Sequence, residues 1–226
     1  MSALPPIWAV VPVKDSAAAK QRLAGTLPAA LRRALALAMA EDVLETLAAV
    51  RTLAGILVVT IDEAAAQIAT RYGAVVSRAS ATESHTAAVT EAARMLATQG
   101  AAMLTLPGDV PLVTPSDIER ILSTHRCVPG FTIVPARDEL GSNAILCSPA
   151  DAVPLRFGEN SFFPHLAAAR ARGIEPVSLA LPRLGLDIDE PADLAAFLQI
   201  PSQTRARALL ERDAAALQLS SSEAHR

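Results

Sequence analysis

The chain has 226 residues, a length that suits one domain or a domain with a short appendage. Hydrophobic residues make up 51% of it and aromatic residues only 3%, so aliphatic side chains and alanine must build the core. A net charge of -3 gives no basic surface for nucleic acid, which we exclude as a partner. The two cysteines, Cys127 and Cys147, lie in no paired motif, which argues against a disulfide framework or a zinc site.

The first apolar run, residues 7–13, is typical of a buried strand. It is too short to span a membrane and has no basic segment before it, so we expect a cytoplasmic protein without membrane contact. Directly after it come three cations, Lys14, Lys20 and Arg22. The segment has neither the glycine pattern of dinucleotide folds nor that of a P-loop. It is therefore either an ordinary solvated loop or a clamp for a triphosphate.

Strand and helix signals alternate through the next hundred residues. Pro28 opens a long helix, and further helices are expected from Asp62, over residues 87–99 and after Thr114. Short apolar runs between them predict strands at residues 55–60, 74–77 and 103–106. This alternation predicts a single α/β domain with a mostly parallel, doubly wound sheet. The first helix carries an apolar stripe of Leu31, Leu35, Met39, Val43, Leu47 and Val50.

In the second half of the chain, predicted strands and helices no longer alternate regularly. Strands are expected at 131–135 and 143–147, and their link is too short for a crossover helix, so they pair antiparallel or lie apart in the sheet. Further strands are expected at 175–180 and 184–188, and helices at 162–172, from Asp189 onward, and at 201–217. We divide the chain into a domain of residues 1–200 and a C-terminal helix with a frayed tail, residues 201–226. That helix can pack on its own domain or on a second subunit, so a homodimer stays open.

Three acids follow predicted strands. Asp109 comes after the turn that ends the strand at 103–106, and Asp187 and Asp189 are two residues apart, which on a strand places them on one face with Cα atoms about 6.5–7 Å apart. Ligands collect beyond the carboxyl ends of such strands, and three carboxylates are an oxygen-only set that suits Mg²⁺. The alternative is that Asp109 caps a turn, Asp189 caps a helix and Asp187 is a surface charge.

Acids of this kind beside a clamped triphosphate point to in-line attack on a nucleotide phosphorus. Positioning and charge neutralisation carry most of such catalysis. The sequence offers no obvious activated serine, cysteine or histidine base. That fits a nucleophile that is itself a phosphate, because a phosphomonoester with a second pKa of about 6 is largely ionised at neutral pH.

Five segments between residues 7 and 198 carry a family pattern in a fixed order. Together they resemble the 2-phospho-L-lactate guanylyltransferases. The segments are Val11-Pro12-Val13-Lys14 with Ala19-Lys20-Gln21-Arg22-Leu23, Leu106-Pro107-Gly108-Asp109-Val110-Pro111-Leu112, Gly141-Ser142-Asn143-Ala144, Arg156-Phe157-Gly158-Glu159-Asn160-Ser161-Phe162, and Leu186-Asp187-Ile188-Asp189-Glu190-Pro191-Ala192-Asp193-Leu194.

The resemblance implies a GT-A-like nucleotidyltransferase fold and a reaction. It implies transfer of GMP from GTP to a three-carbon phospho-acid, with pyrophosphate release, in deazaflavin coenzyme biosynthesis. The acid is 2-phospho-L-lactate, phosphoenolpyruvate or 3-phospho-D-glycerate, since family members differ. By position, the resemblance implies Mg²⁺ ligands and contacts to the phospho-acid. The metal acids fall on Asp109, Asp187 and Asp189, and the phospho-acid contacts on Ser142, Gly158 and Ser161.

Two departures from the family pattern affect the interpretation. Ser142 stands where the family usually has threonine, which keeps the hydroxyl. Ser84-His85-Thr86 replaces a usual Leu-Asn pair in a loop that we expect near the base or ribose, with His85 as a surface residue. Guanine selectivity is therefore open, and the alternatives are a cytidylyl- or uridylyltransferase for another small phosphate and a non-enzymatic nucleotide-binding subunit. Ser161 also suits a helix N-cap, and Arg137 and Arg156 are candidate carboxylate partners by charge and location.

Overall fold

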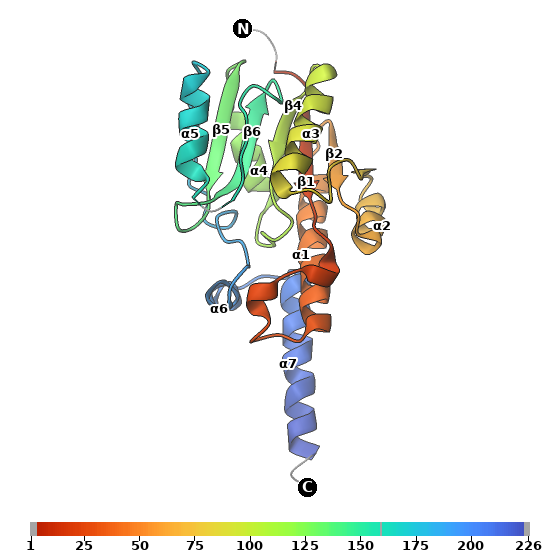
Figure 1. The fold of residues 1–226 in the computed structure, drawn as a ribbon. Coiled ribbons are helices and arrows are strands. Elements are labelled where there is room, and N and C mark those ends of the chain that lie inside the picture. The colour runs from red at the N-terminus through yellow and green to blue at the C-terminus, as the bar shows by residue number, and fades with distance from the viewer. Residues whose placement is uncertain (1–3, 159, 224–226) are drawn as a thin grey trace.

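The computed structural model describes residues 4–158 and 160–223, with side chains to residue 214 except that of residue 18. A seven-stranded sheet runs through it in the order β3-β2-β1-β4-β6-β5-β7 (Figure 1). The strands are β1 (Ile7–Pro12), β2 (Gly55–Val59), β3 (Val75–Ser77), β4 (Ala102–Thr105), β5 (Gly130–Pro135), β6 (Ser142–Ser148) and β7 (Val177–Ser178).

Most neighbouring strands of this sheet are parallel. β1 pairs in parallel with β2 and β4, β2 with β3, and β5 with β7. β6 is antiparallel to both β4 and β5, and the short link of residues 136–141 joins β5 and β6 as a hairpin. The mostly parallel α/β sheet predicted from the sequence is confirmed, with an antiparallel strand inside it.

Helices cover both faces of the sheet (Figure 1). α1 (Ala29–Ala49), α2 (Glu63–Arg71) and α4 (Pro115–Thr124) pack on one face, and α3 (His85–Thr98) and α5 (Phe162–Ala171) on the other. Along β1, Ala9 and Val11 belong to the first core and Val10 to the second. Because both faces are buried, the strands are continuous apolar runs and not alternating ones. The apolar stripe predicted on α1 is buried throughout.

A third apolar cluster lies beyond the carboxyl ends of the parallel strands. It joins the upstream half of α1 to α6 (Pro191–Gln199), to α7 (Arg205–Glu223) and to the short turn η2 (Gln21–Leu23), with η1 (Ser16–Ala18) just before it. Since α1 contributes to this cluster and to the sheet core, it connects the two parts of the molecule. The buried members are Leu23, Leu35, Met39, Leu112, Leu186, Ile188, Leu194, Phe197, Ala206 and Leu210.

Two predicted strands differ from the structure. The expected strand at 175–180 is reduced to Val177–Ser178, and residues 184–188 form no strand although their backbone is described. The N–H of Gly185 bonds to the carbonyl of Leu181 and not to a neighbouring strand. The alternating apolar residues there are buried because the segment crosses between two cores. Leu184 enters the sheet core, and Leu186 and Ile188 enter the third cluster.

The C-terminal helix is fixed to α1 by an acid. Asp42, which is buried, accepts hydrogen bonds from the N–H groups of Arg205 and Ala206 at 2.8 and 3.0 Å. The helix begins at residue 205 and extends to residue 223, so it is displaced from the predicted 201–217. Residues 224–226 of the predicted tail lie outside the described residues. The boundary at residue 200 and the homodimer stay predictions.

None of the helices in the described part of the chain is long and apolar enough to cross a membrane. Cys127 and Cys147 are both free thiols, the first exposed and the second buried.

The anchor of α7 gives a stability prediction. Asp42→Ala leaves two helix-terminal N–H groups without their buried acceptor, so we expect the free energy of unfolding to fall by about 1–3 kcal/mol in urea titrations. The control is Glu45→Ala, which removes an exposed partner of Arg205 and should cost less than about 1 kcal/mol. Equal losses in the two variants would contradict the role of Asp42.

Candidate active site

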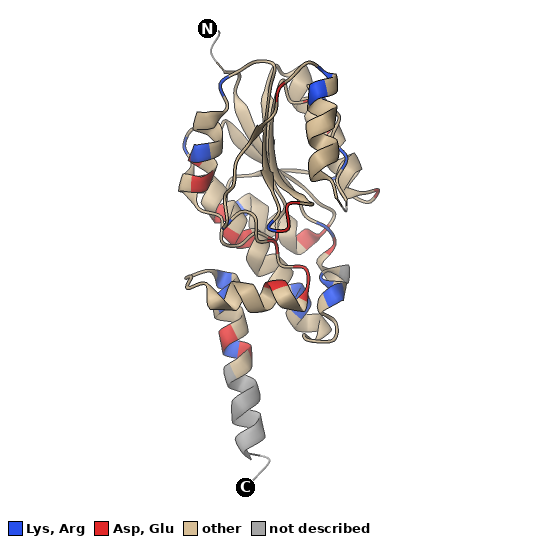
Figure 2. Ribbon diagram, turned by 90° about the vertical axis from the view of Figure 1, so that its left-hand side faces the viewer, with Lys and Arg blue, Asp and Glu red and all other residues tan. Residues whose placement is uncertain are grey.

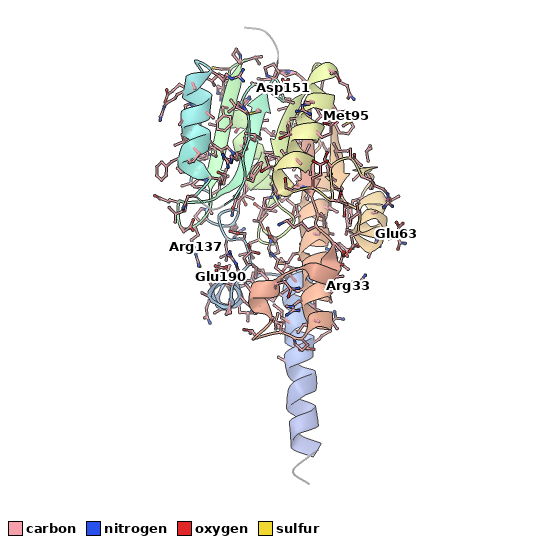
Figure 3. All side chains as sticks on the ribbon, in the orientation of Figure 1. Arg33, Glu63, Met95, Arg137, Asp151 and Glu190 are labelled. Atoms are coloured by element: carbon pink, nitrogen blue, oxygen red, sulfur yellow. The ribbon has the colours of Figure 1, made fainter. Side chains whose placement is uncertain are left out.

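A cleft of about 1410 Å³ opens at the carboxyl ends of the parallel strands, above the third cluster. This is where α/β folds of this kind bind ligands. Arg137 and Glu190 lie at this end of the molecule, and Met95 and Asp151 at the opposite end (Figure 3). The walls come from loops within residues 12–22, 81–85, 107–109, 136–143, 157–161 and 185–193.

Lys20 is a buried ammonium between two acids. Its Nζ lies 2.6 Å from Asp109 Oδ2 and 2.7 Å from Asp189 Oδ1, and its side chain is 6% exposed. Burial alone lowers the pKa of Lys20, but attraction to the two carboxylates outweighs it, so the pKa is raised. The backbone at Lys20 is left-handed, with φ of 53°, an uncommon conformation for a residue with a side chain. The ion pairs therefore hold Lys20 in a strained position.

The other two predicted cations lie nearer the solvent. Lys14 is exposed and lines the cleft. Arg22 pairs with Glu190 at 3.1 Å, and both side chains are more than half exposed. The sequence predicts one clamp of three cations, whereas the structure places Lys14 and Arg22 at the rim and Lys20 inside, among acids.

The basic loop is anchored by Asp62, which the sequence identifies only as a helix cap. The carboxylate of Asp62 caps α2 through the N–H of Ala65 at 2.9 Å. It also accepts the N–H of Ser16 at 2.9 Å and the Ser16 hydroxyl. Burial alone would raise the pKa of Asp62, but these hydrogen bonds outweigh it and lower that pKa. Asp62 thus fixes the start of the loop that carries the cations.

The three predicted metal acids converge on the cleft. Asp187 accepts a hydrogen bond from Asn143 Nδ2 at 3.0 Å, and burial, followed by the charge of Asp109, raises its pKa. Burial also disfavours the charged form of Asp189, but Lys20 outweighs it and lowers the pKa of Asp189. The N–H of Ile188 bonds to the carbonyl of Asp109 at 3.1 Å and joins the two acidic segments.

Asp189 is not the helix cap that the sequence allows. Glu190 is the N-cap of α6, and the carboxylate of Asp193 accepts the N–H groups of Glu190 and Asp189 at 2.9 and 3.2 Å. Because Glu190 takes the cap position, the carboxylate of Asp189 does not cap α6 and binds Lys20 instead.

The acids fit a hard cation in their chemistry. Among the described residues, no group of three or more histidine, cysteine or acidic side chains is arranged to hold a metal ion. Lys20 binds Asp109 and Asp189, and Asn143 binds Asp187. Within the same residues, however, the buried Oδ1 of Asp109 has no hydrogen-bond partner. An all-oxygen set with an unused buried oxygen matches the preference of Mg²⁺.

The residues expected to contact the phospho-acid also line the cleft. The Ser161 hydroxyl donates to Ser142 Oγ at 3.1 Å, and although Ser161 is the N-cap residue of α5, its hydroxyl makes no capping bond. Gly158 has φ of 144°, which strongly favours glycine. The sequence missed His165, whose Nδ1 lies 2.9 Å from Ser142 Oγ. Its place one helical turn after Ser161 is the signal that could have found it.

The segment that departs from the family pattern contacts this same loop. Ser84 caps α3, and Thr86 Oγ1 accepts the N–H of Phe157 at 3.0 Å and donates to its carbonyl at 3.3 Å. The ring centroids of His85 and Phe157 are 4.6 Å apart. His85 is half-buried in the cleft wall and not a surface residue, and burial lowers its pKa to about 4.

The two candidate arginines lie differently. Arg137 is in the cleft wall and pairs with Asp193 at 3.1 Å. Arg156 is exposed and is not part of the described wall, and its backbone N–H donates to His165 Nε2 at 2.9 Å.

Comparison with known proteins gives a family and close relatives. The family model described as "Guanylyl transferase CofC like" matches residues 7–226. The phosphoenolpyruvate guanylyltransferase of Roseiflexus castenholzii is 40% identical over 203 residues, which cover 90% of this chain and 93% of that protein. The 3-phospho-D-glycerate guanylyltransferase of Colwellia psychrerythraea is 35% identical over 185 residues, 82% of this chain and 88% of that protein.

Solved structures confirm the nucleotidyltransferase fold. A protein from Desulfovibrio desulfuricans G20, described as a nucleotide-diphospho-sugar transferase, has a TM-score of 0.75 at 16% identity and covers 94% of this chain and 97% of its own. A 4-diphosphocytidyl-2C-methyl-D-erythritol synthase has a TM-score of 0.61 at 14% identity, and the match covers 92% of this chain and 100% of that protein. At these identities the likeness concerns the fold alone.

The lowered pKa of Asp62 gives a pH prediction. Because this pKa is lower in the folded chain than its ordinary value of 3.8, the stabilisation is present above that value and is lost as the pH falls. We expect Asp62→Asn to lower the free energy of unfolding by about 1–3 kcal/mol at pH 7. In urea titrations from pH 7 to pH 3, the difference from wild type should shrink as the pH falls. A difference independent of pH would show that the carboxylate charge does not anchor the loop.

Proposed function

Since this chain belongs to the CofC-like guanylyltransferase family and is a nucleotidyltransferase, we propose that it transfers GMP from GTP to a three-carbon phospho-acid and releases pyrophosphate. The candidate acids are phosphoenolpyruvate, 3-phospho-D-glycerate and 2-phospho-L-lactate. Relatives named for the first two are 40% and 35% identical to this chain. From the family resemblance we propose the same pathway, deazaflavin coenzyme biosynthesis.

One observation carries the proposal: a single cleft is lined by three acids and, in another part, by two serine hydroxyls. Asp109, Asp187 and Asp189 line one part of it, and the hydroxyls of Ser142 and Ser161 line another. Acidic and basic positions both occur on the ribbon between the sheet and the C-terminal helix (Figure 2). Such a cleft suits a reaction that joins two phosphates and needs both charge neutralisation and hydrogen-bond donors.

The chemistry is a displacement at the α-phosphorus of GTP. A phosphate oxygen of the acid forms a bond to that phosphorus, and the bond to the bridging oxygen of the β-phosphate breaks, so pyrophosphate leaves with the electron pair. The nucleophile is ionised at neutral pH and needs no general base. The half-buried histidine of the cleft wall, His85, is neutral at that pH, since burial lowers its pKa to about 4.

On the nucleotide side, we assign the acids and cations separate roles. Asp109, Asp187 and Asp189 are the proposed ligands of Mg²⁺, which when bound would neutralise phosphate charge. Lys20 holds Asp109 and Asp189 in place through its two ion pairs. Lys14 and Arg22, at the rim, are placed for the charges of the triphosphate.

On the acid side, donors surround the proposed phosphate position. Ser161 makes no capping bond with its hydroxyl, so this hydroxyl can serve an anion at the start of α5, where the helix dipole also favours negative charge. Ser142 supplies a second hydroxyl, and Gly158 provides a backbone turn that brings the loop to the cleft. Because Thr86 binds Phe157, the unusual segment 84–86 also bears on this side.

A turnover screen tests the function directly. With Mg²⁺, each of the four ribonucleoside triphosphates and each of the three phospho-acids, we expect pyrophosphate release with GTP and one of the acids. Release with CTP or UTP in place of GTP would overturn the guanylyl assignment. Release with none of the combinations, from folded protein that still binds GTP, would favour the non-enzymatic alternative.

Removing one acid tests the proposed metal site. Asp187→Ala should lower kcat/KM by about 10²-fold or more, because a ligand of the charge-neutralising ion is lost. Its free energy of unfolding should stay near or above that of wild type, since the carboxylate is buried beside the like charge of Asp109.

The matched control is Asp151→Ala, an exposed acid at the opposite end of the molecule (Figure 3). This variant should keep wild-type kinetics and stability. Wild-type rates in Asp187→Ala would remove Asp187 from the metal site. Mn²⁺ titration followed by electron paramagnetic resonance would then identify which of the remaining acids bind the ion.

A further inference from the structure

His165 is a buried residue of α5 that bonds to Ser142 in the cleft wall and to the backbone of Arg156, in the loop that leads to Gly158. Its Nε2 lies 2.9 Å from the backbone nitrogen of Arg156, in the loop that contains Gly158. Its Nδ1 lies 2.9 Å from Ser142 Oγ, on β6. The side chain is 1% exposed, so the imidazole itself is shielded from the solvent of the cleft.

These bonds determine which ring nitrogen carries the proton. A backbone N–H can only donate, so Nε2 must accept from Arg156 and is unprotonated. Burial lowers the pKa of His165 to about 4, so at neutral pH the ring is uncharged and holds one proton. That proton is on Nδ1, and His165 therefore donates to Ser142.

The hydroxyl of Ser142 is thereby left as a donor. Its oxygen accepts one bond from His165 Nδ1 and a second from the Ser161 hydroxyl at 3.1 Å. Both lone pairs are used, while the proton of Ser142 is taken by neither neighbour. Because Ser142 lines the cleft, this proton is available to a ligand there, and two accepted bonds strengthen it as a donor.

His165 also fixes the loop on the other side of the anion position. The bond to Arg156 holds the start of the segment that leads to Gly158 and Ser161. The ring of Phe157 packs edge-on against His165, with centroids 5.2 Å apart. A single imidazole thus leaves the Ser142 hydroxyl as a hydrogen-bond donor and holds the loop at Arg156 in position.

We propose that His165 is a positioning residue of the phospho-acid subsite, which as an Nδ1–H donor makes Ser142 present its proton to an anionic oxygen of the acid. The identity of that acid rests on the function proposed above. A ligand group that can only accept, such as a phosphate or carboxylate oxygen, is favoured at Ser142. A group that must donate, such as an ammonium or an amide N–H, finds no free lone pair there.

The first test reads the tautomer without any activity. In a ¹⁵N-labelled protein at pH 7.5, two-bond proton–nitrogen spectra, assigned with His165→Gln, should show His165 with a protonated Nδ1 and an unprotonated Nε2. An Nε2–H ring or a charged ring would overturn the proposal. This result does not depend on turnover, so it stands or falls separately from the guanylyltransferase function.

Two substitutions separate the two roles of the ring, as the donor to Ser142 and as the acceptor for the Arg156 N–H. A glutamine at 165 can place an oxygen near the former Nε2 and keep the bond to Arg156, but it cannot donate to Ser142. An asparagine can place an N–H near the former Nδ1 and keep the donor to Ser142. With the acid that the turnover screen identifies, His165→Gln should raise the KM for that acid about tenfold or more. The KM for GTP should change by less than about twofold, because the donor acts only on the acid side. His165→Asn, which keeps the donor, should raise the KM for the acid less than His165→Gln does.

A double-mutant cycle distinguishes positioning from general damage to the fold. If His165 acts through Ser142, adding His165→Gln to Ser142→Ala should raise the KM for the acid no further. Independent, multiplying increases would overturn the proposal.

The control is His125→Gln, at another buried histidine whose pKa is also lowered to about 4 and which bonds to Thr132 and Ser148 away from the cleft. We expect this variant to lose stability and to leave the ratio of the two KM values unchanged. A shift in that ratio equal to that of His165→Gln would also count against the proposal. If wild-type protein turns over no phospho-acid, the proposed function fails while the tautomer result still decides the role of His165.

Discussion

The ion pairs of Lys20 with Asp109 and Asp189 are the interaction on which the cleft depends. They join segments that are far apart in the sequence, and the Asp187 carboxylate is buried close to them. Folding brings three partly buried acids together, and their mutual repulsion has to be compensated. The ammonium compensates two of them and at the same time holds its own strained backbone, so loop shape and charge balance are set by one side chain.

The two ends of the cleft differ in charge: one carries carboxylates and the other neutral hydroxyl donors. The acidic end concentrates charge and leaves a buried oxygen of Asp109 unused, a state that favours a cation. The other end carries hydroxyls, and its imidazole, His165, is neutral because burial lowers its pKa to about 4. An anion meets neutral hydrogen-bond donors there, the hydroxyls of Ser142 and Ser161. The link between Thr86 and Phe157 joins α3 to this second end.

Features that local chemistry decides could be predicted from the sequence. The apolar stripe of α1 follows from its steps of three and four residues and the helix start at Thr114 from a local capping preference, and both are present. The strand at 184–188 was wrong because alternating burial arises equally when a coil crosses between two cores. Asp189 could not be separated from an N-cap because the next residue, Glu190, takes that position only in the folded loop. His165 was missed since its partners are a backbone amide and a residue on another element.

The identity of the bond that forms is the central claim, and ³¹P NMR of the products tests it most directly. After incubation of the wild-type protein with GTP, Mg²⁺ and each phospho-acid, the account predicts a pair of coupled doublets from a new mixed anhydride and an equal amount of pyrophosphate. With the phosphate oxygens of the acid labelled with ¹⁸O, the label should appear in the bridge. GDP with inorganic phosphate, or an anhydride formed from CTP and not from GTP, would contradict it.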